Sequence, residues 1–257
     1  MTVSCKKSDQ PRKESSNQLP HSKLMAKVEL QLPTTDGLRS FLTPVLFLIA
    51  AVGALAIDMP VAQFSKNVSC PRLVVELLDR AEPFGHFFGA VMALTAVVLL
   101  DPAMRGRIGW AIGAILGGGL LANLIKLLVL RSRPRASNLI DGTVWDTFGG
   151  WFQRDLNSRS QSFPSGHTAT AVGLAVVLAA WYPRGRWLFA TIAALVGLHR
   201  IQHLAHFPSD VFAGAAVGWF VAACCLRGDR DRFENRGHDI ATVTHDIKAT
   251  RDRADAG

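Results

Sequence analysis

Long windows without charged side chains are the feature that most limits how this chain can fold. Between Ser40 and Leu226 the charged residues are gathered into short clusters, and windows without Asp, Glu, Lys or Arg lie between these clusters. Such windows predict transmembrane helices, because a charged side chain is costly in the hydrocarbon of a bilayer. Hydrophobic residues make up 49% of the 257 residues, which agrees with this interpretation. The sequence therefore predicts a membrane protein.

Six apolar windows predict an all-α fold, a six-helix transmembrane bundle. The third window carries Gly109, Gly113 and Gly117, and the sixth carries Gly214 and Gly218, so glycine recurs at every fourth position. Small residues at this spacing let helices approach closely in lipid. The six windows are residues 41–57, 83–100, 108–125, 165–183, 187–198 and 211–226.

The two longest segments between the windows differ in their expected structure. Residues 58–82 are expected to form a mixed-charge loop with a short helix over residues 73–80. Residues 136–163 are expected to form a helical or irregular loop between the third and fourth spans. Aromatic residues are common at the depth of the lipid headgroups, and this loop contains Trp145, Phe148, Trp151 and Phe152.

Composition divides the chain into three parts. Residues 1–37 are rich in Ser, Lys, Gln and Pro and are expected to form a disordered basic tail. Residues 38–226 form the predicted membrane domain, and residues 227–257 form a charged tail with seven basic and seven acidic residues. The net charge of +8 does not indicate a nucleic-acid partner, because no basic face with recognition features is visible. The four cysteines show neither metal-ligand spacing nor a disulfide framework.

An even number of spans places both tails on the same side of the membrane. Arginines are concentrated on that side, in the turns after the second and fourth windows and directly after the last window. The positive-inside rule assigns this side to the cytoplasm, and we expect a location in the plasma (inner) membrane. Three polar clusters, residues 126–135, 163–167 and 200–210, then lie together on the opposite, non-cytoplasmic face.

These polar clusters contain the residue types that bind a phosphate. Arginine forks bind phosphate oxygens bidentately, lysine adds a point charge, and the free N–H groups at a helix start bind anions. Lys126 and Arg133 are seven residues apart, so on a helix they share a face and can reach one group. The expected phosphate ligands are Lys126, Arg133, Ser165, Gly166 and Arg200.

Two histidines and a carboxylate are the expected catalytic groups. Pro208 disfavours helix at Phe207, so His206 is expected just before the sixth helix and Asp210 in its first turn. Asp210 would then accept a hydrogen bond from Nδ1 of His206 and leave Nε2 free as a nucleophile. His167 would protonate the leaving oxygen.

A metal-dependent mechanism is one alternative. Phosphoryl transfer at metal ions needs several carboxylates. Only Asp210 lies in the cluster, while Asp141, Asp146 and Asp155 lie in the loop of residues 136–163. We therefore expect no metal and no cofactor.

Each expected phosphate ligand could instead have a purely structural role. Arginines at helix ends can anchor among headgroups, a lysine can snorkel, and a serine can cap a helix. Any one of these residues alone favours that interpretation. Their coincidence on one predicted face favours a site.

The same residues form a signature in three parts. Lys126-x6-Arg133-Pro134, Pro164-Ser165-Gly166-His167 and Arg200-x5-His206-x3-Asp210 follow one another along the chain. This signature resembles the motif of the type 2 phosphatidic acid phosphatase (PAP2) superfamily, and the likeness covers roughly residues 126–210. One position departs from the family pattern, since His199 stands where serine usually precedes the arginine of the third part.

The resemblance implies a six-helix membrane phosphatase that works without metal through a phosphohistidine. By this likeness His206 is the nucleophile, Asp210 orients it and His167 is the acid. Relatives act on phosphatidate, phosphatidylglycerol phosphate, polyprenyl diphosphate or lipid A, and the superfamily also includes soluble vanadium haloperoxidases. The apolar windows favour the lipid phosphatase branch.

Three functions stay open from the sequence. The leading hypothesis is hydrolysis of a lipid phosphate monoester or diphosphate. A lipid phosphotransferase would use the same phosphohistidine, and a non-enzymatic membrane protein would use the cluster for anion binding or transport. The expected partners are a lipid phosphate substrate and the bilayer, with no nucleic acid, while the lipid headgroup and the oligomeric state are left open.

Overall fold

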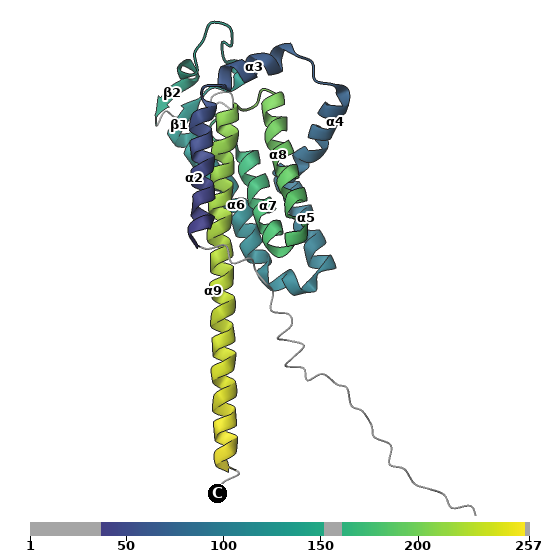
Figure 1. Ribbon diagram of the computed structural model, residues 1–257, viewed down its shortest axis with the longest axis vertical. Helices are drawn as coiled ribbons and strands as arrows, with labels where there is room; N and C mark the ends of the chain where they lie inside the picture. Colours follow the sequence, from purple (N-terminus) through teal and green to yellow (C-terminus); the bar gives the residue numbers. More distant parts are fainter. Residues whose placement is uncertain (1–36, 152–160, 255–257) are drawn as a thin grey trace, which may run out of the picture. The chain divides into compact units, whose positions relative to one another are not determined.

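The computed structural model describes residues 37–151 and 161–254, and it describes side chains over residues 41–150 and 161–232. The predicted disordered tail, apart from residue 37, lies outside the described residues. Helices dominate the structure (Figure 1). In chain order the elements are α2 (Gly37–Ala54), α3 (Asp58–Asn67), α4 (Arg72–Ala81), η1 (Glu82–Gly85), α5 (Phe87–Leu100), η2 (Pro102–Arg107), α6 (Ile108–Leu128), β1 (Val129–Arg131), η3 (Pro134–Ala136), η4 (Trp145–Thr147), β2 (Phe148–Trp151), α7 (Gly166–Trp181), η6 (Pro183–Gly185), α8 (Arg186–Gln202) and α9 (Pro208–Ala254).

Each predicted apolar window contains a helix, but helix length alone does not give six spans. The segments Pro102–Leu128 and Pro208–Arg232 are long and apolar enough to cross a membrane. Two further spans arise if each bent pair counts as one, Phe41–Ala54 with Asp58–Asn67 and Arg72–Gly85 with Phe87–Leu100. Helix α7 has 16 residues, about 24 Å of helix, which is shorter than a hydrocarbon core of about 30 Å. The count of six stays a prediction.

The segment of residues 58–82 is more helical than its mixed charge predicts. The short helix expected over residues 73–80 is confirmed as α4, and α3 is an additional helix. Pro60 lies in the first turn of α3, where a missing N–H is tolerated. Helix α2 meets α3 at a bend of 70°, and the segment Arg72–Gly85 meets α5 at a bend of 72°.

Helix α9 is the element against which much of the bundle packs. It lies along α2, α6 and α7 (Figure 1). A Cβ atom on Gly218 would overlap the backbone carbonyl of Ala169 in α7, and one on Gly117 of α6 would lie 3.0 Å from Val221. The glycine spacing therefore lets backbones approach as predicted. Gly109 has nothing within 4 Å of its ideal Cβ position, so the first glycine of the α6 stripe takes no part in this packing.

Large apolar side chains are exposed along several helices. Val52, Phe88 and Leu100 are 70%, 71% and 85% exposed. A water-soluble protein rarely leaves so much apolar surface uncovered, whereas helices in a bilayer face lipid tails with such residues. The exposed side chains therefore support the membrane interpretation of the apolar windows.

The charged segment of residues 227–257 begins inside a helix. Helix α9 continues beyond residue 226 to Ala254. Asp229 in this extension is buried and forms an ion pair with Arg107 of η2, with 2.6 Å between Arg107 Nε and Asp229 Oδ2. Arg107 is one of the arginines expected to mark the cytoplasmic side, and it is buried rather than free in the headgroups.

A short antiparallel sheet lies where a helical or irregular loop was expected. Strand β1 pairs with β2 so that Val129 lies opposite Trp151 and Arg131 opposite Phe148. The fold is predominantly helical as predicted, and the sheet is a local departure: β1 forms where the chain leaves α6 in an extended conformation at Val129, and β2 lies within the loop of residues 136–163. Of the aromatic residues of this loop, Trp145 is 68% exposed, whereas Phe152 and the side chain of Trp151 lie outside the described residues.

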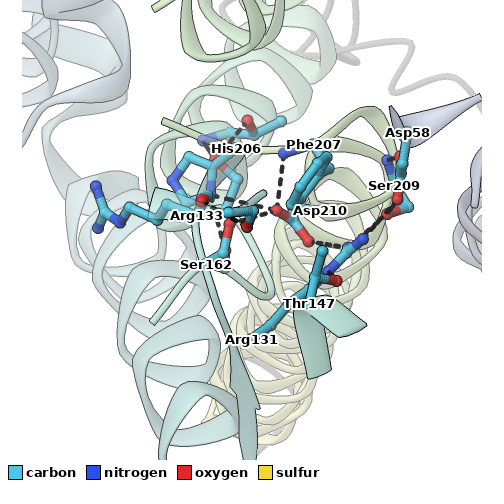
Figure 2. Close-up of polar contacts among 12 residues, drawn as sticks. Asp58, Arg131, Arg133, Thr147, Ser162, His206, Phe207, Ser209 and Asp210 are labelled. Atoms are coloured by element: carbon cyan, nitrogen blue, oxygen red, sulfur yellow. Dashed lines mark hydrogen bonds and ion pairs between the residues drawn. The ribbon is translucent and has the colours of Figure 1, made fainter. Parts of the chain in front are cut away.

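Arg131 joins the sheet to α3 and α9 through a buried ionic network. Its guanidinium forms ion pairs with Asp58 at the start of α3 and Asp210 in the first turn of α9, and all three side chains are completely buried. Arg131 also donates to Thr147 Oγ1 and Ser209 Oγ, at 3.1 and 2.7 Å. Figure 2 shows the guanidinium between the two carboxylates.

Aromatic rings and helix capping complete this network. The guanidinium carbon of Arg131 lies 4.6 Å from the ring centre of Phe148 and 4.4 Å from that of Phe207. Asp58 accepts a hydrogen bond of 3.0 Å from the backbone N–H of Ser209 and thus caps the first turn of α9. A buried arginine can be stable when carboxylates neutralise its charge and its N–H donors have acceptors, whereas an unpaired buried arginine cannot.

Replacement of Arg131 by methionine is expected to destabilise the protein strongly. The variant leaves two buried carboxylates without their cation, which costs about 3 kcal/mol or more. For a domain of this size the melting temperature in detergent should fall by roughly 6–12 °C. Arg135→Met is the matched control because Arg135 is exposed, and it should change stability by less than about 0.5 kcal/mol. Equal melting temperatures for both variants would contradict a stabilising network.

Candidate active site

All three polar clusters lie at the ends of helices that meet around the start of α7 and α9. Lys126 is in the last turn of α6, and a Cβ atom on Gly166 would lie 3.6 Å from its Nζ atom. Arg200 is in the last turn of α8, and Asp210 is in the first turn of α9. Lys126 interacts electrostatically with Arg133 and Arg200, so the structure brings these predicted phosphate ligands together. Arg133 follows strand β1 and lies outside α6, so the expectation that it shares a helix face with Lys126 is wrong.

Ser165 forms the N-cap of α7. Its hydroxyl accepts hydrogen bonds from the backbone N–H and the side chain of Thr168, at 3.4 and 3.0 Å. Ser165 is completely buried, and its backbone N–H donates to the carbonyl of Asp210 at 3.0 Å. The capping role is thus established, and the first N–H groups of α7 face an anion site beside Lys126.

Of the three arginines whose buried Nε donors no described residue satisfies, two lie at this site, and the third is Arg230 in the extension of α9. The Nε atoms of Arg133 and Arg200 are buried and have no hydrogen-bond partner within the described ranges. Burial, together with the neighbouring Arg135 and Arg200, holds the pKa of the Arg133 guanidinium below its ordinary value. Unsatisfied buried donors are rare and costly in native proteins, so the Nε donors of Arg133 and Arg200 are candidates for binding an anionic ligand.

His206 is positioned by a tight turn that ends α8. Leu204 has a positive φ of 53°, and its N–H donates to the carbonyl of Ile201 while Ala205 N–H donates to that of Arg200. This pattern is a Schellman motif, the usual way to end a helix with one left-handed residue. The N–H of His206 also donates to the carbonyl of Arg200, at 3.2 Å, so the turn fixes His206 directly to the backbone of the arginine.

The expected hydrogen bond from His206 to Asp210 is replaced by one to a backbone carbonyl. Nδ1 of His206 donates to the carbonyl of Ser162 at 2.7 Å, whereas Asp210 Oδ2 is 3.8 Å from Nδ1. The prediction of a direct hydrogen bond between His206 and Asp210 is therefore wrong, because other donors already occupy the carboxylate of Asp210. It accepts from Ser162 Oγ at 2.6 Å, from Phe207 N–H at 2.8 Å and from Arg131 (Figure 2).

Asp210 therefore orients His206 through Ser162. The hydroxyl of Ser162 is held by Asp210, and its N–H donates to the carbonyl of Arg131 at 2.9 Å. Its own carbonyl then fixes the Nδ1–H tautomer of His206, which leaves Nε2 with the lone pair. Sequence analysis missed Ser162 because a backbone carbonyl acceptor has no sequence signature.

The environment of His206 favours the neutral imidazole. Its pKa is lowered from 6.5 to about 4, chiefly by burial and also by the positive charges of Lys126 and Arg133, against an opposing effect of Asp210. His206 is 2% exposed. A neutral ring with a free Nε2 lone pair is the form that can attack phosphorus.

His167 lies beside two residues that were not predicted to belong to a site. Its Nε2 atom is 3.3 Å from Nε2 of His86, and it is 3.9 Å from Oε1 of Glu82. Glu82 also lies 3.7 Å from Arg200. His167 interacts electrostatically with Arg200, His206 and Lys126, which places it within the same cluster. The only signal for His86 in the sequence was its position at the start of an apolar window.

Known proteins are similar to this chain in sequence and in fold. Residues 107–234 match the family model of the PAP2 superfamily. Over 103 residues the chain is 39% identical to "Lipid A 1-phosphatase" of Rhizobium johnstonii, a match that covers 40% of each protein. Over 136 residues it is 32% identical to "Lipid phosphate phosphatase 1" of Arabidopsis thaliana, covering 44% of this chain and 42% of that protein. The matched part thus spans less than half of these curated relatives.

One crystal structure supports the fold. Aquifex aeolicus LpxE is similar with a TM-score of 0.50 and 23% identity, over 66% of this chain and 95% of that chain. This likeness shows the fold alone. Together with the apolar helices and the lipid phosphatase relatives, it identifies an integral membrane protein.

The unsatisfied arginines should bind a tetrahedral oxyanion. Replacing Arg200 by methionine removes charge-assisted hydrogen bonds worth about 1.5–3 kcal/mol, so the dissociation constant for vanadate should rise roughly 10- to 100-fold. Calorimetry in detergent measures this change. Arg184→Met, at the exposed turn between α7 and α8, is the control and should bind vanadate like the parent. Unchanged binding by Arg200→Met would show that the anion lies elsewhere.

Proposed function

Because the chain belongs to the PAP2 superfamily through residues 107–234, we propose that it hydrolyses a lipid phosphate monoester or diphosphate at the membrane surface. The observation that carries this proposal is the pair of buried, unsatisfied Nε donors of Arg133 and Arg200 beside a buried neutral His206. A phosphate dianion supplies the acceptors that these donors lack. The imidazole supplies the nucleophile.

In the first step Nε2 of His206 attacks phosphorus and the bond from phosphorus to the lipid oxygen breaks. His167 donates a proton to that oxygen, so the lipid leaves as a neutral alcohol or, from a diphosphate, as a protonated phosphate. Lys126, Arg133, Arg200 and the N–H groups at the start of α7 stabilise the charge on the transferred phosphoryl oxygens. The product on the protein is a phosphohistidine at His206.

In the second step water attacks the phosphohistidine. His167, now without its proton, accepts a proton from the water while the bond between phosphorus and Nε2 breaks. Inorganic phosphate leaves, and both histidines return to their starting protonation states. The hydrogen bond from Nδ1 to the Ser162 carbonyl supports the positive charge on the imidazole while the phosphoryl group is attached.

We propose that no metal ion takes part at the reacting phosphate. The carboxylate of Asp210 is occupied by Arg131, Ser162 and Phe207, so it has little capacity left for a cation. Lys126, Arg133 and Arg200 supply the positive charge that metal ions provide in other phosphatases. Phosphate release should therefore continue in excess chelator.

A lipid is the favoured phosphate carrier. Two relatives are named for lipid A 1-phosphate and lipid phosphate, and the helices around the site expose large apolar side chains. Lipid A 1-phosphate is the first substrate to test, within a panel of lipid phosphates and diphosphates. We further propose six spans with cytoplasmic termini, an inner-membrane location and the site on the opposite face, as the arginine distribution predicts.

Two rival functions predict different products. A phosphotransferase would move labelled phosphate from one lipid to another rather than to water, and an anion transporter would show flux into liposomes without turnover. Labelled substrate followed into the lipid and aqueous phases separates the three.

Replacing His206 by glutamine should abolish phosphate release. Loss of the nucleophile is expected to lower kcat by at least roughly 1,000-fold. Quenching the parent in alkaline detergent with labelled substrate should trap a protein-bound phosphate that survives base and is lost in acid, and the variant should trap none. Circular dichroism and thermal unfolding confirm that the variant is folded. Parental turnover by a folded His206→Gln protein would exclude the mechanism.

The pH profile should report the lowered pKa of His206. Because the folded-state pKa is about 4 rather than 6.5, the imidazole stays neutral down to pH values near 4. The value of kcat/KM should therefore stay nearly constant from pH 7 to pH 5 on this limb and fall about tenfold per pH unit below 4. An acid limb with its midpoint near 6.5 would contradict the buried, neutral nucleophile.

A further inference from the structure

A second group of titratable side chains lies outside the proposed phosphate site. His199 lies in the last turn of α8 and His203 is its C-cap residue, four positions on, so the two side chains lie on one face of the helix end. Asp79 of α4 lies opposite them, with its Oδ1 atom 3.3 Å from Nε2 of His199 and 3.2 Å from Nε2 of His203. The two imidazole rings are 4.3 Å apart between centres. None of these residues has a role in the reaction proposed above.

The spacing of these three atoms fits a transition-metal site. Zinc–nitrogen and zinc–oxygen bonds are about 2.0–2.1 Å long, and the edges of a tetrahedron with such bonds measure about 3.3 Å. The two Asp79 distances match that edge length, and all three ligand atoms lie within 4.8 Å of one another. Two imidazoles and a carboxylate form a common donor set for zinc and its neighbours.

The surroundings leave room for a metal to enter. The side chains of Asp79 and His203 are 51% and 45% exposed, whereas that of His199 is 9% exposed. A fourth ligand can therefore come from water. Helix α4 packs against α8 around this group, so the scaffold holds the ligands in place without the metal.

A second trio of possible ligands, Glu82, His86 and His167, is less suited to a cation. Arg200 lies 3.7 Å from the carboxylate of Glu82, and His167 interacts with Lys126 as well as Arg200. Glu82 and His86 already form a close ion pair. A metal ion there would meet two fixed positive charges, whereas no arginine or lysine forms an ion pair with Asp79 among the described residues.

We propose that Asp79, His199 and His203 bind one divalent first-row transition metal, with Zn²⁺ the best fit. The ion ties α4 to the last turn of α8. That turn also contains Arg200, whose carbonyl accepts from Ala205 and His206, so the ion stiffens the segment that carries the phosphate cation and the nucleophile. It takes no part in the reaction. The departure from the family motif at His199 then has a function of its own.

Cobalt binding to the full-length protein tests this site directly. The protein is purified in detergent with an affinity tag that contains no histidine, stripped with chelator and titrated with Co²⁺. Tetrahedral Co²⁺ absorbs strongly between about 500 and 700 nm, and one equivalent per chain should give this spectrum and be displaced by Zn²⁺. Zn²⁺ should also raise the melting temperature of the stripped protein.

Variants identify the ligands. Asp79→Asn and His203→Gln should each weaken Co²⁺ binding by more than roughly 100-fold, beyond the loss that a supporting residue causes. Both residues are half-exposed, so the variants should fold. His86→Gln, which removes a ligand of the second trio, should bind like the parent. His206→Gln should also bind like the parent, so this test is independent of the proposed phosphatase activity.

Three results would overturn the site. They are the absence of bound Co²⁺ in the parent, parental affinity in Asp79→Asn, or loss of the spectrum in His86→Gln. The last result would place the metal in the second trio. Parental Co²⁺ affinity in Asp79→Asn would show instead that Asp79 only accepts hydrogen bonds from the two imidazoles.

Discussion

The buried ion network of Arg131 is the constraint on which the site depends. One guanidinium lies between Asp58 and Asp210 with no exposure to water, so the buried group carries one more negative than positive charge. Such a charge is stable only if other positive charges lie near it. Lys126, Arg133 and Arg200 supply them at the neighbouring helix ends. The network therefore both fixes α9 against α3 and favours the cations that line the candidate site.

The site has charges of opposite sign on its two sides. Behind His206 lie the carboxylate of Asp210 and the carbonyl of Ser162, which hold the ring and its proton. In front lie arginine donors with no partner among the described residues. In the proposed reaction, an imidazole held from behind by acceptors and facing cations would meet an incoming dianion in a fixed geometry. This preorganisation is the usual source of electrostatic catalysis.

The sequence predicted the helices and the positions of the motif residues at their ends, because apolar windows and short motifs are local signals. Lys126, Gly166, Arg200 and Asp210 all lie at the helix ends where the windows place them. The role of Arg131 was not predictable in this way, since its run of basic residues suggested a surface and its partner Asp58 is 73 residues away. The span count was equally hard to predict, because the bends of 70° and 72° depend on tertiary packing.

The Schellman turn at Leu204 links the two halves of the proposed chemistry mechanically. The backbone carbonyl of Arg200 accepts hydrogen bonds from the N–H groups of Ala205 and His206. Leu204 is held at positive φ, which leaves this turn little freedom to rearrange. Arg200 and the backbone of His206 must then move as one rigid piece. In the proposed reaction, the spacing between a phosphate ligand and the attacking ring would therefore stay constant while a bulky lipid enters and leaves.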